Sequence, residues 1–165
     1  MSNPNSEHNH LADRSNGDCP LPRDNTMTVQ KNGVVAVISQ EGKLLLIRRA
    51  EHVAAPGKYC FPGGAIEVGE TEEAALIREL REELGVDVKP IRRLWESITP
   101  WGVHLTWWKA RLASEARFKP DPNEVAEVFW MTPADVFATS ELLDSNRQFM
   151  ERVLSGEICL DSDDG

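Results

Sequence analysis

The segment GAIEVGETEEAALIRELREELGV spans residues 64–86 and consists of a glycine-containing loop followed by a helical pattern. Its second part predicts a helix over residues 71–84, because Thr71 is a good amino-terminal cap and Gly85 is a natural carboxy-terminal stop. The glutamates directly after the cap suit the positive end of the helix dipole. Apolar residues at helical spacing predict the stripe that faces the core, namely Ala74, Ile77, Leu80 and Leu84.

The predicted helix also has an acidic face. Glu79, Glu82 and Glu83 are three and four positions apart, so their carboxylates project from one side. Arg78 and Arg81 relieve the resulting repulsion only in part, because their Cβ atoms point around the helix. Converging carboxylates suit a hard divalent cation, with Mg²⁺ or Mn²⁺ the natural choice. An acidic helix face alone is usually just solvated, so the residues around the helix decide between these interpretations.

The loop before the helix has two features that favour a ligand site. Gly63 and Gly64 let the backbone approach a ligand or a metal closely, because neither residue has a Cβ atom. Glu70 and Arg78 are placed to clamp the loop onto the helix if the loop folds back. The loop and the helix are therefore expected to act as one unit.

This unit resembles the signature of the Nudix hydrolase family, G-x5-E-x7-R-E-U-x-E-E-x-G-U, in which U is a bulky aliphatic residue. Residues 64–86 match every specified position of the signature. The upstream stretches LLLIRRA and PGKYCFPGG and the downstream stretch EVFWMTPADV also resemble MutT-like pyrophosphohydrolases of this family. The similarity covers about residues 32 to 140, and the two ends of the chain show no resemblance to the family.

The resemblance implies an α/β fold, an α/β/α sandwich with a mixed β-sheet and a catalytic loop–helix–loop. That unit binds Mg²⁺ or Mn²⁺ in the family, which hydrolyses a nucleoside diphosphate linked to another group X. Glu70 and Arg78 match the pair that braces the loop. The positions that match the metal ligands are Gly63, through its carbonyl oxygen, and Glu79, Glu82 and Glu83.

The general base lies outside the signature. In MutT-like members it is a glutamate in the loop before a strand that contains a Trp, and Glu124 stands six residues before Trp130. Glu127 is the rival, and strand alternation places it on the opposite face from Glu124. We favour Glu124, so the predicted catalytic residues are Arg78, Glu79, Glu82, Glu83 and Glu124.

Arg48 and Arg49 end a predicted strand that leads towards the site. Either is suited to bind a phosphate through two hydrogen bonds, and a solvated strand end explains the pair equally well. The predicted reaction is Mg²⁺-dependent hydrolysis of a phosphoanhydride bond, in a nucleoside triphosphate or an ADP-ribose-like substrate. The alternative is a non-catalytic module of the same fold that senses a nucleotide or regulates other proteins.

The formal net charge of −9 argues against a stable complex with nucleic acid, which needs clustered Lys and Arg. The cysteines are Cys19, Cys60 and Cys159, and their odd number fits a reducing compartment better than a disulfide framework. The sequence shows no signal peptide, and no apolar run approaches the roughly 18 residues of a membrane helix. We therefore expect a cytoplasmic protein without membrane contact that acts on a small-molecule nucleotide, and a homodimer is left open.

We expect one Nudix domain over residues 28–157. A disordered amino-terminal tail over residues 1–27 precedes it, because that stretch has few apolar side chains, and an acidic tail over residues 158–165 follows it. Alternating or continuous apolar runs predict strands, and a last apolar stripe predicts a final helix over residues 141–154. The predicted strands cover residues 33–39, 43–49, 91–98, 103–112 and 125–131.

Overall fold

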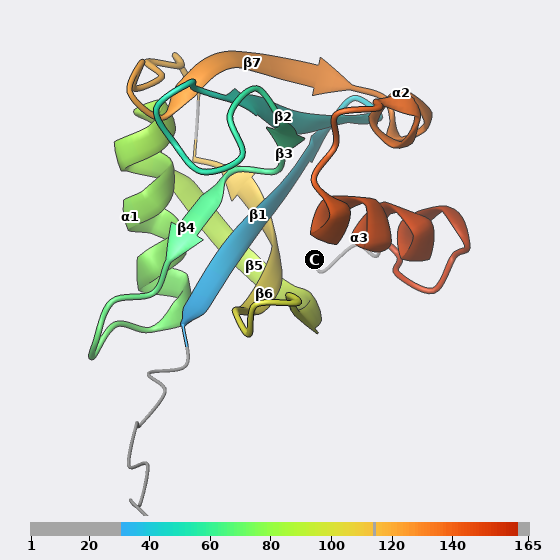
Figure 1. The fold of residues 1–165 in the computed structure, drawn as a ribbon, viewed down its shortest axis with the longest axis horizontal. Coiled ribbons are helices and arrows are strands. Elements are labelled where there is room, and N and C mark those ends of the chain that lie inside the picture. Colours follow the sequence, from blue (N-terminus) through green and yellow to red (C-terminus); the bar gives the residue numbers. More distant parts are fainter. Residues whose placement is uncertain (1–30, 114, 162–165) are drawn as a thin grey trace, which may run out of the picture.

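The computed structural model describes residues 31–113 and 115–161 (Figure 1). The predicted tail over residues 1–27 and residues 162–165 of the predicted acidic tail lie outside this part of the chain. Among the described residues, none of the helices combines the length and the apolar character of a membrane-spanning segment. Its elements are β1 (Asn32–Gln40), β2 (Lys43–Arg49), β3 (Tyr59–Cys60), β4 (Gly63–Ala65), α1 (Glu72–Leu84), β5 (Val88–Ile98), β6 (His104–Leu112), β7 (Val125–Met131), α2 (Pro133–Ala138) and α3 (Asp144–Leu154).

The strands form a mixed sheet in two groups that meet at the β1–β2 hairpin. In one group β1 is parallel to β6 and antiparallel to β4, and β5 pairs with β6. In the other group β2 is antiparallel to both β3 and β7. Helix α1 covers one side of the strands, and α2 and α3 lie on the opposite side (Figure 1). This arrangement confirms the predicted α/β fold with a mixed sheet between helices.

Alternation along β2 divides the core into two apolar layers. Leu45 and Ile47 pack in the layer that contains α1, whereas Leu44 and Leu46 pack in the layer that contains α3. The reason is that successive side chains of a strand point to opposite faces. All four are at most 2% exposed, and burial of each such side chain contributes about 1.5–3 kcal/mol. The two residues that end β2 are therefore also expected on opposite faces.

Helix α1 has the predicted caps, but its buried stripe is rotated. The Thr71 hydroxyl accepts the backbone N–H of Ala74 at 3.1 Å, and Gly85 ends the helix in the left-handed region, with φ at 65°. The expectation that Ala74 faces the core was wrong, since that residue is exposed. The buried stripe is shifted around the helix towards the acidic face, so Glu83 is buried with the apolar residues. The buried face consists of Ala75, Leu76, Leu80, Glu83 and Leu84.

Helix α3 begins at Asp144, later than the predicted start at residue 141. The residues before it bond to β3 instead. The N–H of Tyr59 donates to the backbone oxygen of Glu141 at 2.9 Å, and the N–H of Leu143 donates to that of Tyr59 at 3.0 Å. These tertiary bonds compete with the first turn of a helix. Beyond α3, Ile158 is buried in the α3 layer, so the packing continues past residue 157.

Candidate functional site

Strand β4 passes close to β1 and α1 because glycine occupies two of its positions. A Cβ atom at Gly64 would lie 2.2 Å from Cδ of Glu79. A Cβ atom at Gly63 would lie 2.1 Å from the backbone oxygen of Val34. Backbone atoms leave no room for a side chain at Gly63, whereas a side chain at Gly64 would displace the Glu79 carboxylate. The glycines therefore let the Glu79 carboxylate lie directly against the backbone of β4.

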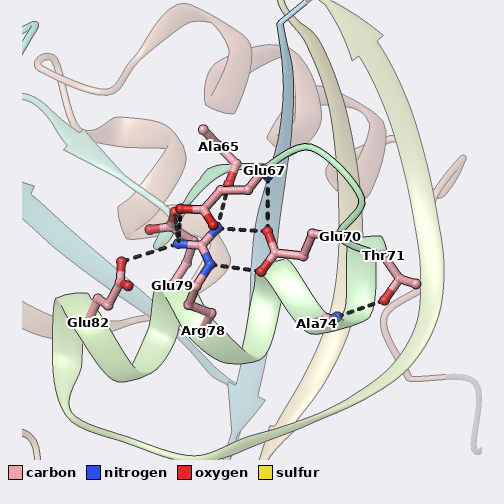
Figure 2. A network of polar contacts seen from close by, with 8 residues as sticks. All are labelled: Ala65, Glu67, Glu70, Thr71, Ala74, Arg78, Glu79 and Glu82. Atoms are coloured by element: carbon pink, nitrogen blue, oxygen red, sulfur yellow. Dashed lines mark hydrogen bonds and ion pairs between the residues drawn. The ribbon is translucent and has the colours of Figure 1, made fainter.

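Arg78 joins the loop after β4 to helix α1 (Figure 2). Its Nε donates to Oε1 of Glu70 at 2.8 Å, and its Nη2 donates to Oε2 of Glu70 at 2.9 Å. Nη2 also donates to the backbone oxygen of Ala65 at 2.8 Å. Nη1 donates to Glu79 at 2.8 Å and to Glu82 at 3.2 Å. The two residues of the predicted brace are thus in bidentate contact, and the same guanidinium binds two candidate metal ligands.

Glu70 connects the backbone of the loop to Arg78. Its Oε2 accepts the backbone N–H of Glu67 at 3.0 Å in addition to the Arg78 bond. The hydrogen bonds from Arg78, followed by the one from Glu67, lower the pKa of Glu70 to about 2. The carboxylate is therefore charged throughout the neutral range, which keeps the loop closed on the helix.

Glu83 is the buried member of the acidic face, with 7% of its surface exposed. Its Oε2 accepts the backbone N–H of Gly63 at 3.1 Å. Burial raises the pKa of Glu83 to about 8; the Gly63 bond and Arg49 oppose this shift, whereas the charges of Glu79 and Glu124 add to it. Burial also raises the pKa of Glu79, against the effect of its arginine neighbour. Two carboxylates of α1, those of Glu79 and Glu83, are therefore poorly solvated.

The three helix glutamates do not converge on one point in this structure. Within residues 31–113 and 115–161, no group of three or more His, Cys, Asp or Glu side chains is arranged to hold a metal ion. The reason is local, since Arg78 binds Glu79 and Glu82 while Gly63 binds Glu83. The donor chemistry nevertheless fits a hard divalent cation, because all the donors are oxygens and a cation would offset the burial of negative charge.

The two arginines that end β2 point to different faces. Arg48 pairs with Glu127 of β7, with Nη2 and Oε2 separated by 3.3 Å. Arg49 follows the alternation to the α1 side, where its Nε donates to the backbone oxygen of Ala54 at 2.7 Å and its charge lowers the pKa of Glu83. Of the two predicted phosphate ligands, Arg49 therefore lies at the acidic face and Arg48 does not.

The two rival bases are also separated. Glu124 lies in the loop before β7, and its N–H donates to the backbone oxygen of Asp121 at 3.0 Å. Its charge raises the pKa of both Glu79 and Glu83, which places it near the helix carboxylates. Glu127 is held by Arg48 instead. Glu124 is thus the candidate base that lies at the acidic face.

A cleft of about 980 Å³ opens beside these residues, which is enough for a nucleotide. Its walls come from β1, β4, the loop before α1 and the start of α3, and they include Arg49, Glu70 and Asn146. Asn146 is 4% exposed, and its Oδ1 accepts the backbone N–H of Phe61 at 2.8 Å. The sequence pattern did not indicate Asn146 as a site residue. A signal was present, because it is a polar residue on the apolar face of the final helix.

A glycine loop braced onto an acidic helix beside a mixed sheet defines the Nudix class of fold. A family model described as the NUDIX domain matches residues 29–153. The chain therefore belongs to the NUDIX family.

Curated relatives and solved structures agree with this assignment. The chain is 29% identical over 123 residues to the NAD-capped RNA hydrolase NudC of Vibrio atlanticus, a match that covers 73% of this chain and 44% of that protein. It is 44% identical over 54 residues to the CTP pyrophosphohydrolase of Escherichia coli, which covers 33% of this chain and 40% of that protein. Both matches span less than half the relative's length. The crystal structure of the MutT protein from Methanosarcina mazei shares the fold, with a TM-score of 0.66, 24% identity, and coverage of 77% of this chain and 94% of that one.

Proposed function

We propose that the chain is a divalent-metal-dependent pyrophosphohydrolase that cleaves a phosphoanhydride bond in a nucleoside diphosphate derivative. The NUDIX family, to which the chain belongs, acts on derivatives of this kind. The proposal rests on the buried Glu83, which lies with the poorly solvated Glu79 beside the cleft, where the charge of the exposed Glu124 also raises the pKa of Glu83. Such a group of carboxylates lowers the stability of the fold, and strongly shifted groups beside a cleft are typical of functional sites.

Three glutamates of α1 would hold Mg²⁺ or Mn²⁺, namely Glu79, Glu82 and Glu83, together with the carbonyl of Gly63. The bound ion would offset the negative charge of the phosphates. Glu124 would accept the proton that the attacking water loses. It lies outside α1, and its charge raises the pKa of both Glu79 and Glu83.

The remaining residues would position and bind. Arg78 and Glu70 hold the loop against α1 through two hydrogen bonds. Arg49 lies on the cleft wall, where its guanidinium, whose Nε is held by the backbone oxygen of Ala54, would bind a phosphate group. Arg48 is left out of the proposed site, because it pairs with Glu127 on the other face of β2.

The proposed substrate is a small nucleotide, either a nucleoside triphosphate or an ADP-ribose-like molecule. The name of one relative specifies CTP, which supports a nucleoside triphosphate as substrate. The name of another specifies RNA with an NAD cap, which supports a dinucleotide-type diphosphate such as the ADP-ribose-like molecule. The net charge of −9 disfavours a long nucleic acid as the main substrate, since an acidic surface repels its phosphates.

A substrate screen tests the proposal. The full chain is incubated with Mg²⁺ and a panel of nucleoside triphosphates, ADP-ribose and NAD, and the products are separated by chromatography. We expect release of a nucleoside monophosphate from at least one of these substrates. Nucleotide binding without turnover across the panel would contradict the proposal and favour the alternative of a nucleotide-sensing module.

A further inference from the structure

The loop that contains Glu124 is attached to the end of helix α1. The N–H of Asp121 donates to the backbone oxygen of Glu83 at 2.8 Å, and the N–H of Lys119 donates to that of Leu84 at 2.8 Å. Carbonyl groups in the last turn of a helix have no partner within the helix, so this loop supplies the missing donors. Glu83 therefore binds β4 through its side chain and the Glu124 loop through its backbone.

The approach of this loop to α1 leaves little space. Gly85 follows the helix with φ at 65°, a conformation that favours glycine. A Cβ atom at Gly85 would lie 3.0 Å from Cβ of Lys119 and 3.2 Å from its backbone oxygen. The loop is thus packed directly against the end of the helix.

Asp121 organises the loop between these bonds and Glu124. Its Oδ1 accepts the backbone N–H of Asn123 at 2.9 Å and the side-chain Nδ2 of Asn123 at 3.0 Å, which makes an Asx turn. Its backbone oxygen accepts the N–H groups of Glu124 at 3.0 Å and of Val125 at 2.8 Å. Prolines on both sides of Asp121 fix the backbone angle φ at the neighbouring positions.

We propose that Asp121 is a positioning residue, which fixes Glu124 relative to the carboxylates of α1. The inference rests on the proposed function, in which Glu124 accepts the proton of the attacking water. A displacement of about 1 Å in a catalytic group can lower a rate roughly a hundredfold. Loss of the Asx turn therefore lowers turnover and leaves the nucleotide cleft, formed mainly by β1, β4 and the loop before α1, in place.

The first test measures the loop directly. Asp121→Ala removes the acceptor of the Asx turn, and Asp121→Asn keeps an oxygen at the same place. Asp135→Ala is the matched control, because it removes a similar short contact, from the Thr132 hydroxyl to Asp135 at 2.7 Å, at the start of α2. We expect hydrogen exchange at the Glu124 and Val125 amides to accelerate at least about tenfold in the alanine variant and to stay unchanged in the other two. Unchanged exchange in Asp121→Ala would overturn the proposal.

The second test connects the loop to the reaction. We expect Asp121→Ala to lower kcat roughly ten- to a hundredfold with KM within about twofold, and Asp121→Asn to restore most of kcat. In a Glu124→Gln background, Asp121→Ala should lower kcat no further, because its effect acts through Glu124. Unchanged kcat, or an equal further loss in that background, would overturn the proposal. Absence of hydrolysis by the unaltered chain would contradict the proposed function, whereas the exchange experiment would still decide the positioning.

Discussion

Glu83 links three parts of the site, because it lies on α1, accepts a bond from β4 and offers its backbone oxygen to the Glu124 loop. We predict that Glu83→Gln lowers turnover at least about a hundredfold, since the amide keeps the size and removes the charge. The metal-free variant should melt at an equal or higher temperature, because a neutral amide is easier to bury. Glu73→Gln on the exposed side of α1 is the control. Normal turnover in Glu83→Gln, measured by steady-state kinetics, would remove Glu83 from the site.

The choice of base is a second question at the residue scale. We predict that Glu124→Gln lowers kcat by about a hundred- to ten-thousandfold with little change in KM, because a base acts on water in the transition state. Glu127→Gln should change kcat by no more than about twofold, since Glu127 pairs with Arg48 on the other face. The two variants are compared at saturating Mg²⁺. A larger loss at Glu127 would reverse the assignment, and small losses at both would point to a helix carboxylate such as Glu79.

Residue spacing was enough to find the acidic face and the Glu70–Arg78 pair, because both follow from helix geometry and the glycine loop. It did not indicate that Arg78 also binds Glu79 and Glu82, since that depends on side-chain rotamers. It did not indicate Asp121 either. The bond from Asp121 to Glu83 joins backbone atoms of two segments that only the tertiary fold brings together.

At the scale of elements, the contact between Glu70 and Arg78 holds the loop onto α1 and makes stability depend on pH. The pKa of Glu70 falls from its ordinary value of 4.5 to about 2 in the folded chain. The contact therefore stabilises the fold fully above about pH 4.5, and this contribution is lost as the pH falls towards 2. We predict that Glu70→Gln lowers Tm by a few degrees at pH 7, and that the difference shrinks over this acidic range.

Thermal unfolding at a series of pH values checks the prediction for Glu70. Glu67→Gln is the matched control, because the Glu67 carboxylate lies 4.0 Å from Arg78 and its side chain is 70% exposed. That control should change Tm much less, as exposed ion pairs are weak. Equal Tm values for Glu70→Gln and the unaltered chain at neutral pH would show that the pair does not stabilise the loop.

The elements themselves differed in how well the sequence predicted them. The ends of α1 were predictable because Thr71 and Gly85 act locally, through a side-chain cap and a left-handed backbone. The start of α3 was not, because the residues before it are held by bonds to Tyr59, far away in the sequence. The rotation of α1 was not predictable either, since several neighbouring stripes of the helix contain enough apolar residues to face a core.

At the scale of the whole molecule, activity should depend on a divalent cation. We predict that chelation abolishes turnover and that Mg²⁺ or Mn²⁺ restores it, because the candidate ligands are all oxygens. Zn²⁺ should be a poor substitute, since no His or Cys is among them. Calorimetric titration of Mg²⁺ into the unaltered chain and into Glu83→Gln measures binding separately from turnover. Full activity after exhaustive metal removal would contradict the prediction.

The two groups of strands that meet at the β1–β2 hairpin have a consequence for protein engineering. Arg49 ends β2 and Glu124 directly precedes β7, both strands of one group, whereas α1 follows β4 of the other group. The chain passes between the groups three times, after β1, after β3 and after β6. The shortest contiguous segment that contains Arg49, α1 and Glu124 therefore covers residues 49–124, and it leaves out β1, which pairs with β2, β4 and β6, and β7, which pairs with β2. A graft of the Nudix segment onto a foreign scaffold would lack Arg49 and Glu124, so transfer of the activity requires transfer of the entire domain.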